Sequence, residues 1–270
     1  MKILGILSLF LTLAVSTVKN CDENHYYGND GDTTCTAKVD NFNRIVADGV
    51  ASVFFTQGNE FNIEIEGDKI SVECLKLEVI NRTLHISDDT NKLDENNNKK
   101  HWWQYFFNFN SNDNEGRSHR INIYITAPDL EKVNMNGVGS FHINDELTVD
   151  HGLDFNSNGV GSLSLNSVSC GYAEIHHNGV GSLSINNFEC DNNIYIDKGG
   201  VGSANINLKA QDVWLNSSGV GSVTLNTKCR KIEISASGVG STTVYGTADD
   251  YSVIKKGIGS VNVSGLSTVK

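Results

Sequence analysis

A four-residue phrase, Gly-Val-Gly-Ser, returns along the second half of the chain at a nearly fixed interval. Successive copies start 22, 20, 21, 19, 19 and 19 residues apart. The copies begin at Gly137, Gly159, Gly179, Gly200, Gly219, Gly238 and, with Ile in place of Val, Gly257. A fixed period near 20 residues is typical of a solenoid, in which each repeat forms one coil stacked on the previous coil. The phrase therefore says much about the architecture and little about the chemistry.

Apolar and polar residues alternate on both sides of the phrase. The apolar positions lie six and four residues before its first Gly, and four and six residues after it. In the third coil these positions are Ala173, Ile175, Leu183 and Ile185, and in the last coil they are Tyr251, Val253, Val261 and Val263. A period of two predicts strands with one buried face. We therefore expect an all-β, single-stranded β-helix, right-handed and with coils of about 19–22 residues, preceded by a β-rich N-terminal part.

The phrase itself is predicted to be the corner between two strands. We expect its Val to break the alternation by one residue, so that the chain bends and keeps the Val side chain inside. Glycine on both sides of the Val allows backbone angles that a Cβ would forbid. The Ser is small enough for a tight corner, and no His–Asp pair recurs at a fixed offset from it, so the sequence does not indicate a nucleophile.

Asparagine recurs at equivalent positions of successive coils. One such column is Asn144, Asn166, Asn186, Asn207 and Asn226, and shorter ones are Asn136, Asn158 and Asn178, and Asn134 and Asn156. Stacked Asn side chains can hydrogen-bond along a solenoid and satisfy turn backbone. We interpret these residues as structural.

The N-terminus is typical of an exported protein. Lys2 is followed by an apolar run over residues 3–15 that is too short to span a membrane comfortably, with small residues near its end. We predict a signal peptide over 1–20, a Cys-bracketed segment over 21–38, and a β-solenoid domain over 39–265 with an inserted polar and aromatic loop at 88–119. The C-terminal residues are not hydrophobic, so we expect no transmembrane anchor and a secreted or cell-surface protein.

The charge of the chain narrows the class of partner. Without Lys2 and Lys19, which fall in the predicted signal peptide, 19 basic residues face 32 acidic ones. Such an excess of negative charge argues against nucleic acid and anionic membranes as partners. The sequence also indicates neither a metal site nor a cofactor.

Six cysteines in an exported chain predict disulfides. Cys21 and Cys35 bracket an acidic segment that a bridge could close. Cys170 and Cys190 occupy the same position of adjacent coils, about 4.8 Å apart, which is within the range that a disulfide accepts. Cys74 and Cys229 remain unassigned.

Two sets of aromatic residues are candidates for ligand binding. The inserted loop carries Trp102, Trp103, Tyr105 and Phe106. These rings either pack against the solenoid or contact a ligand. Tyr195 and Trp214 share one outward position of neighbouring coils, so their rings should stack, either to bind a sugar or to stabilise the sheet.

Three sequons, at Asn81, Asn216 and Asn262, are predicted glycosylation sites if the host glycosylates exported proteins. A glycan on Asn216 would lie on the same face as Trp214, two residues away, and would obstruct that surface.

Two segments resemble the putative auto-transporter adhesin, head GIN domain family. One is residues 42–53 with Gln57-Gly58 after them, and the other is residues 123–133, which lead into the repeats. The resemblance covers roughly residues 39–265, with both segments in the right order around a variable loop. It implies a secreted or surface-exposed β-solenoid with an adhesin-like role and supplies no catalytic residues. The regular Gly-Val-Gly-Ser coils and the candidate disulfides depart from many members of that family.

Three functions fit these observations. The first is a non-catalytic adhesin-like protein that binds carbohydrate or a cell-surface partner, and the second is a structural component of an extracellular coat. The third is a polysaccharide-active enzyme, which would need clustered carboxylates on one face. Outward positions do hold Asp154, Glu174, His176, Asp197 and Glu233. Because acidic residues are abundant on this chain and no basic row accompanies these, we expect no enzymatic activity.

Overall fold

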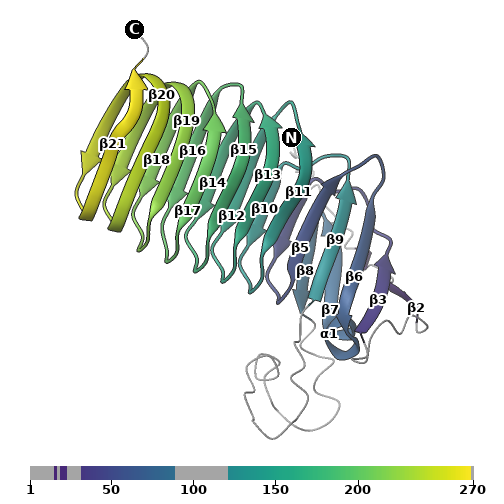
Figure 1. Cartoon of the computed structure of the whole chain (residues 1–270). Helices are drawn as coiled ribbons and strands as arrows, with labels where there is room; N and C mark the ends of the chain where they lie inside the picture. The colour runs from purple at the N-terminus through teal and green to yellow at the C-terminus, as the bar shows by residue number, and fades with distance from the viewer. Residues whose placement is uncertain (1–14, 17–18, 23–31, 89–120, 269–270) are drawn as a thin grey trace, which may run out of the picture.

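The structure, a computed structural model, describes residues 15–16, 19–22, 32–88 and 121–268. It is a β-solenoid of about seven turns, which confirms the predicted fold class. Figure 1 shows the coils stacked side by side from the purple N-terminal strands to the yellow C-terminal ones. In the described part of the chain, no helix is long and apolar enough to cross a membrane.

The strands form two faces. The strands that precede the phrase build one face, here called the leading sheet. In spatial order its members are β7 (Leu75–Ile80), β8 (Thr83–Asp88), β4 (Arg44–Ala47), β10 (Lys132–Met135), β12 (Gly152–Ser157), β14 (Tyr172–His177), β16 (Asn193–Lys198), β18 (Asp212–Ser217) and the second halves of β19 (Val223–Ala236) and β20 (Val239–Lys255).

The strands that follow the phrase build the trailing sheet. In spatial order its members are β2 (Lys19–Asp22), β3 (Asp32–Ala37), β6 (Asn62–Asp68), β9 (Ile121–Ala127), β5 (Ser52–Gln57), β11 (Phe141–Thr148), β13 (Leu163–Cys170), β15 (Leu183–Cys190), β17 (Ala204–Lys209), the first halves of β19 and β20, and β21 (Ile258–Thr268). Two further elements, β1 (Val15–Ser16), which pairs with β7, and the helix α1 (Lys69–Cys74), complete the N-terminal part.

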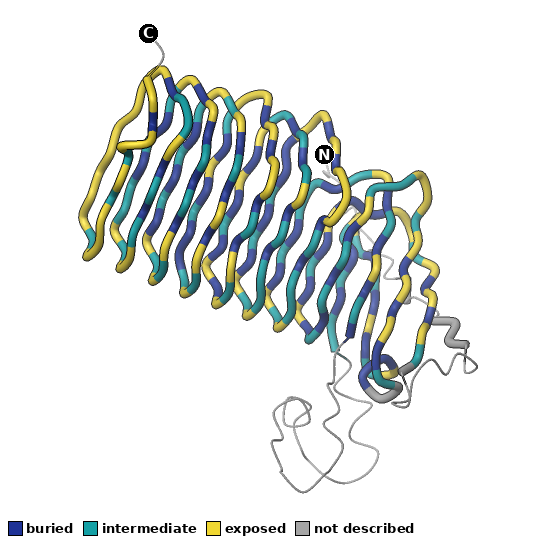
Figure 2. Tube along the Cα trace, viewed as in Figure 1, coloured by how far each residue is buried: buried dark blue, intermediate teal, exposed yellow. Residues whose placement is uncertain are grey.

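The core runs along the axis between the two sheets. The predicted inward positions are buried in every coil except the last, as the dark blue bands of Figure 2 show. In β14 and β15, for example, Ile175 and Ile185 are completely buried. Their registers join equivalent residues of successive coils, such as Phe155 to Ile175 and Ile175 to Ile196. Each coil therefore buries its apolar face mainly against its two neighbours.

The predicted inward placement of the phrase's Val is wrong. Val160, Val180 and Val220 are about half exposed, at 51%, 50% and 51%. The alternation in fact continues unbroken through the phrase, with glycine at the inward positions. A Cβ on Gly179 would lie 2.0 Å from the carbonyl oxygen of Gly159 in the preceding coil. The glycines are therefore the positions of close coil-to-coil approach, and the Val side chains form a column on the outside of the corner.

The inward prediction also fails in the last coil. Tyr251 and Val253 are 40% and 38% exposed, and Val261 and Val263 are only partly buried. These residues continue the inward columns, but no described strand follows to cover them. Position within a coil predicts direction, whereas burial needs a coil on both sides.

The N-terminal coils are not stacked in chain order. β4 lies between β8 and β10, and β5 lies between β9 and β11. The chain first adds the β8–β9 coil on one side of β4–β5 and then continues with β10 on the other side. The segment Asp48-Gly49-Val50-Ala51-Ser52 resembles the phrase. Its Val50 bridges Val138, which places this segment at the same corner as the later copies.

Polar columns hold the corners together as predicted. Asn186 donates to the side chain of Asn166 at 3.0 Å, and Asn166 donates to the backbone of Asn144 at 2.8 Å. The Ser column works similarly, because the backbone N–H of Ser162 donates to Oγ of Ser140 at 3.0 Å. These side chains satisfy one another and the neighbouring backbone, which supports the structural interpretation.

The predicted Cys170–Cys190 disulfide is corrected by the structure, in which both residues are free thiols. The register does pair them, but each Sγ donates to a backbone carbonyl, Cys170 to Tyr172 at 3.3 Å and Cys190 to Asn193 at 3.2 Å. Burial and the neighbouring thiol raise the pKa of Cys170, with the hydrogen bond to Cys190 as the largest cause. Cys35 does form a disulfide, and the β2–β3 register places residue 21 opposite it. The pairing with Cys21 stays a prediction.

Candidate functional site

Two rows of outward side chains run across the leading sheet, perpendicular to its strands. The first row lies five residues before the phrase and the second lies three residues before it. From β12 to β20 the first row reads Asp154, Glu174, Tyr195, Trp214, Glu233 and Ser252, and the second reads Asn156, His176, Asp197, Asn216, Ser235 and Ile254. The parallel register brings these residues together from six strands, although neighbours in a row are about 20 residues apart in the chain.

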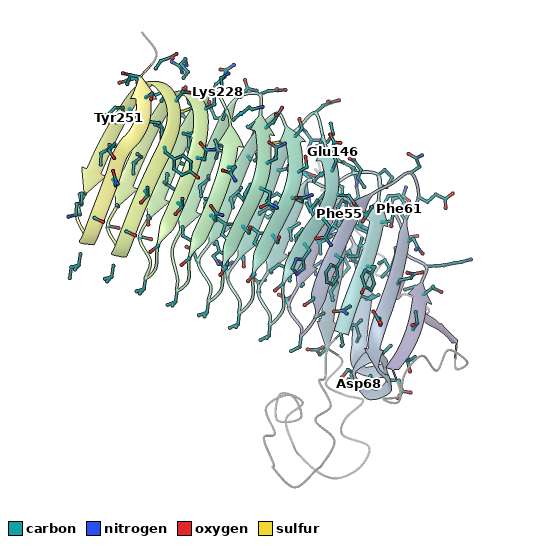
Figure 3. The ribbon with its side chains drawn as sticks, in the orientation of Figure 1. Phe55, Phe61, Asp68, Glu146, Lys228 and Tyr251 are labelled. Carbon is teal, nitrogen blue, oxygen red and sulfur yellow. The ribbon has the colours of Figure 1, made fainter. Side chains whose placement is uncertain are left out.

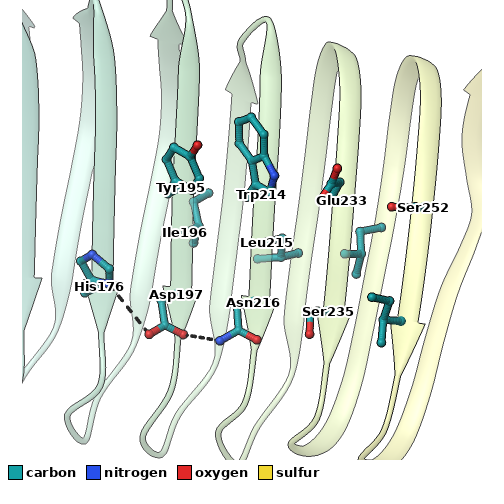
Figure 4. A pocket seen from close by; sticks show the side chains of 12 residues that line it. His176, Tyr195, Ile196, Asp197, Trp214, Leu215, Asn216, Glu233, Ser235 and Ser252 are labelled. Carbon is teal, nitrogen blue, oxygen red and sulfur yellow. Dashed lines mark hydrogen bonds and ion pairs between the residues drawn. The ribbon is translucent and has the colours of Figure 1, made fainter.

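The first row contains the predicted aromatic pair. The rings of Tyr195 and Trp214 stack with centroids 4.5 Å apart and planes inclined by 10°. Tyr195 is 43% exposed. Tyr195 covers one face of the Trp214 indole, and the row continues beyond the other face with the shorter Glu233 and Ser252 (Figure 4). The sheet surface therefore steps down on the C-terminal side of the indole.

The second row is polar and hydrogen-bonded. Asn216 Nδ2 donates to Asp197 Oδ1 at 2.8 Å, and His176 Nδ1 lies 3.8 Å from Asp197 Oδ2, as the dashed lines of Figure 4 mark. His176 Nε2 also lies 3.7 Å from Glu174 Oε2. These contacts orient a carboxylate and an amide beside the aromatic pair.

Together the two rows line an open hollow of about 250 Å³. Its apolar surface comes from the rings and Ile254, and its polar groups include Asp197, Asn216 and Glu233. A hollow of this size and shallow shape suits one or two sugar rings better than a deeply buried cofactor. An aromatic face next to hydrogen-bonding side chains can hold the apolar face of a sugar ring while its hydroxyls are bound at the edge.

The charge of the hollow is negative. Lys231 Nζ lies 2.7 Å from Glu233 Oε1, and this hydrogen bond is the main reason that the pKa of Glu233 is held below its ordinary value. A hydrogen bond from Trp214 lowers the pKa of Glu233 further. Glu233 therefore carries its charge at neutral pH. In the described ranges no group of three or more His, Cys, Asp or Glu side chains could hold a metal ion.

The remaining candidate site residues lie in several separate parts of the chain. Trp102, Trp103, Tyr105 and Phe106 lie outside the described residues. Among the sequons, Asn81 is exposed at the turn between β7 and β8, Asn216 lines the hollow, and the Asn262 side chain accepts hydrogen bonds from Ser264.

The sequence analysis identified Asp197 and His176 only as outward-facing residues, among several acidic ones. It did not place them beside the aromatic pair. The spacing could have shown this, because both residues stand three residues before a phrase, as do Asn216 and Ser235.

A second aromatic stack, on the trailing sheet, was not predicted from the sequence. There Phe54 lies between Tyr124 and His142, with centroids 5.1 and 4.8 Å away. Its three strands are stacked out of chain order, so the spacing in the sequence gave no indication.

Comparison with protein families identifies one match. The model of the putative auto-transporter adhesin, head GIN domain family matches residues 41–202, which is more than half of the chain. No curated protein matches the sequence.

Solved structures with the same architecture include proteins from Bacteroides and Parabacteroides species. A putative adhesin from Bacteroides fragilis is 27% identical with a TM-score of 0.64, over 86% of this chain and 96% of the other. A putative adhesin from Parabacteroides distasonis is 18% identical with a TM-score of 0.57, over 87% and 98% of the two chains. A protein from the same species titled a putative lipid binding protein is 18% identical with a TM-score of 0.52, over 90% and 98%. At 18% identity the likeness concerns the fold alone.

Proposed function

Because the chain belongs to the putative auto-transporter adhesin, head GIN domain family, we propose that it is an exported, non-catalytic adhesin-like protein that binds a glycan on its leading sheet. The observation that carries this proposal is the step beside Trp214, where the partly exposed indole lines one hollow with the polar groups of Asp197, Asn216 and Glu233. Family membership supports the adhesin-like role, and the geometry of the hollow supports the class of ligand.

The charge of the hollow narrows the ligand further. Glu174, Asp197 and Glu233 surround the rings, and Lys231 is engaged by Glu233. A uronic acid or a sialic acid would meet like charge here. We therefore expect a neutral glycan whose hydroxyls donate to Asp197 and Glu233 and accept from the Asn216 amide.

This proposal also bears on the sequon at Asn216. The Asn216 amide already donates to Asp197, and Ser217, the next residue, is buried. A glycan attached to Asn216 would occupy the hollow itself. Binding there requires an unmodified Asn216, so protein made in a glycosylating host should bind less.

A glycan array with the exported chain, followed by calorimetric titration of the best neutral glycan, tests the proposal. Trp214→Ala should weaken binding at least about tenfold, since the sugar loses its stacking face. Tyr245→Ala is the control, because Tyr245 is an exposed aromatic on the trailing sheet, away from the hollow. Binding that is unchanged in Trp214→Ala, with a lowered melting temperature, would assign the pair to sheet stabilisation.

In that event Trp102 and Trp103 of the inserted segment become the next candidates for glycan binding. A Trp102→Ala, Trp103→Ala double variant in the same titration distinguishes the two surfaces. An array without any bound glycan, for parent and variants alike, would favour the structural coat component instead.

A further inference from the structure

The C-terminal end of the solenoid is open. The stretch Asp249–Lys255 of β20 pairs with β19 on one side, while β21 covers only the earlier half of β20. Tyr251 and Val253 extend the buried columns of Ile232 and Ile234, and both side chains are exposed (Tyr251 is marked in Figure 3). The described chain thus ends with its apolar core uncovered on the leading sheet.

The N-terminal end is built differently. There β3, β6 and β9 pair antiparallel, the β7–β8 hairpin closes the leading sheet, and α1 follows β6. The outermost core residues of the trailing sheet on that side, Cys35 and Ala37 of β3, are buried. A second copy could therefore not add its C-terminal end to this N-terminal end by continuing the parallel stack. Contact between two C-terminal ends instead places one open edge of β20 against an identical open edge.

The free backbone groups of the edge can be assigned. In a parallel ladder alternate residues direct their N–H and C=O to the same neighbour. The N–H of Lys256 donates to the carbonyl of Ala236 in the preceding coil. Residues of even number in this stretch therefore face β19, and the N–H and C=O of Tyr251, Val253 and Lys255 face the open side.

We propose that two copies of this chain associate through this edge, with their Asp249–Lys255 strands antiparallel about a two-fold axis at Ser252. In that register Asp249 lies opposite Lys255 of the second copy, and Tyr251 lies opposite its Val253. All four are odd-numbered, so their free N–H and C=O groups can bond across the axis. The strand is thus complementary to itself in charge, in apolar side chains and in backbone hydrogen bonding.

Acidic and basic residues at an edge can also serve to prevent such pairing. The arrangement of the charges decides whether this edge is protected from pairing or complementary to a second copy. A strand protected by charge alone would not need opposite charges at symmetric distances from its centre, whereas Asp249 and Lys255 stand three residues on either side of Ser252.

The two-fold axis stands perpendicular to the sheet, so the outward faces of both leading sheets lie on the same side. Trp214 lies on β18, two strands from the edge, and five strand spacings separate the two indoles, about 24 Å. This consequence rests on the proposed function, because it would present two glycan sites to one surface and raise the avidity. The self-association itself does not depend on that function.

The test is the molar mass of the exported full chain, measured by sedimentation or light scattering over a range of concentrations. We expect a reversible dimer. Lys255→Asp and Asp249→Lys should each raise the dimer dissociation constant at least about tenfold, since each places two like-charge pairs across the axis. The double variant Asp249→Lys, Lys255→Asp should restore the dimer. Lys38→Asp, an exposed residue directly after β3 at the other end of the solenoid, is the control for charge alone.

A parent chain that stays monomeric at every concentration overturns the proposal. So does a dimer that both single variants leave intact, because the contact would then lie elsewhere. Unchanged melting temperatures of the variants exclude unfolding as the cause of a lost dimer. In the glycan titration, monomeric Lys255→Asp should keep the affinity of the single site and lose only the avidity for a glycan-coated surface. Loss of the single-site affinity in Trp214→Ala, by contrast, concerns the proposed function alone.

Discussion

Substituting a corner glycine should cost far more stability than substituting the neighbouring valine. Gly181 has a φ of 152°, and a Cβ on it would lie 2.0 Å from the carbonyl oxygen of Gly161. Contacts of a Cβ below 3.0 Å are essentially never observed, so in Gly181→Ala the two coils must separate locally by roughly 1 Å. Val180, which precedes it, is 50% exposed and touches solvent at the corner.

The magnitude follows from the bonds that such a separation would break. The N–H of Gly161 donates to Val180 O at 2.9 Å, and the N–H of Val180 donates to Gly159 O at 3.0 Å. Lengthened by roughly 1 Å, both exceed hydrogen-bonding distance, at a cost of about 1–3 kcal/mol for each group left unsatisfied. The positive φ adds about 1–2 kcal/mol for a residue with a Cβ. We expect Gly181→Ala to lose about 3–6 kcal/mol of the free energy of unfolding.

Urea unfolding monitored by circular dichroism measures this difference. For a domain of this size a loss of that order corresponds to a decrease in melting temperature of roughly 10 °C or more. The control is Val180→Ala, which should lose less than about 1 kcal/mol because the side chain is half exposed. If Val180→Ala proved more costly than Gly181→Ala, the valine would be a core residue and the assignment of the glycines to the tight positions would be refuted.

Three further predictions concern the core. Ile175→Asp should lose more than about 4 kcal/mol of unfolding free energy, because it places an unpaired charge in a closed stack; a parent-like melting curve would contradict this. Burial lowers the pKa of His177 below its ordinary value. Its neutral form therefore stabilises the fold fully above about pH 6.5, and this contribution is lost as the pH falls below that value. The acid-induced decrease in melting temperature should be smaller in His177→Gln than in the parent. Alkylation without reductant should label Cys170 and Cys190 only after unfolding, and a bridged Cys170–Cys190 peptide in the mass spectrum would show that the thiols are not free.

The arrangement of the coils could be predicted because it depends on spacing alone. Ile175 and Ile196 occupy the same position of their coils, and parallel pairing then places one above the other. The same reasoning predicted the stacking of Tyr195 on Trp214. The direction of the phrase's Val was missed because the glycines were assigned to a bend. Counting by two through the phrase would have shown that glycine, and not valine, falls on the inward positions.

Other features depend on contacts that spacing does not contain. The exposure of Tyr251 and Val253 follows from the absence of a described strand beyond β20, whereas their position in the coil is that of core residues. The β4–β5 coil lies between two later segments of the chain, so the stack of Phe54 with Tyr124 and His142 joins residues whose order in space differs from their order in sequence. The hollow needed both rows at once. Trp214 and Asn216 lie on one strand, but only the register of β16 against β18 brings Asp197 beside them.

Coils as similar as these could pair with the wrong neighbour during folding. If a segment docked one coil too early or too late, most of its apolar contacts and corner hydrogen bonds would still form, so such a frameshift would be only weakly penalised. The departures from regularity distinguish one coil from the next. His177 and Lys198 are buried and adjacent in register on β14 and β16, and each would meet an apolar or small residue in a shifted register. The unequal coil lengths and the displaced pairing between Ile185 and Phe188 act in the same way, and so the irregular residues specify which coil is which.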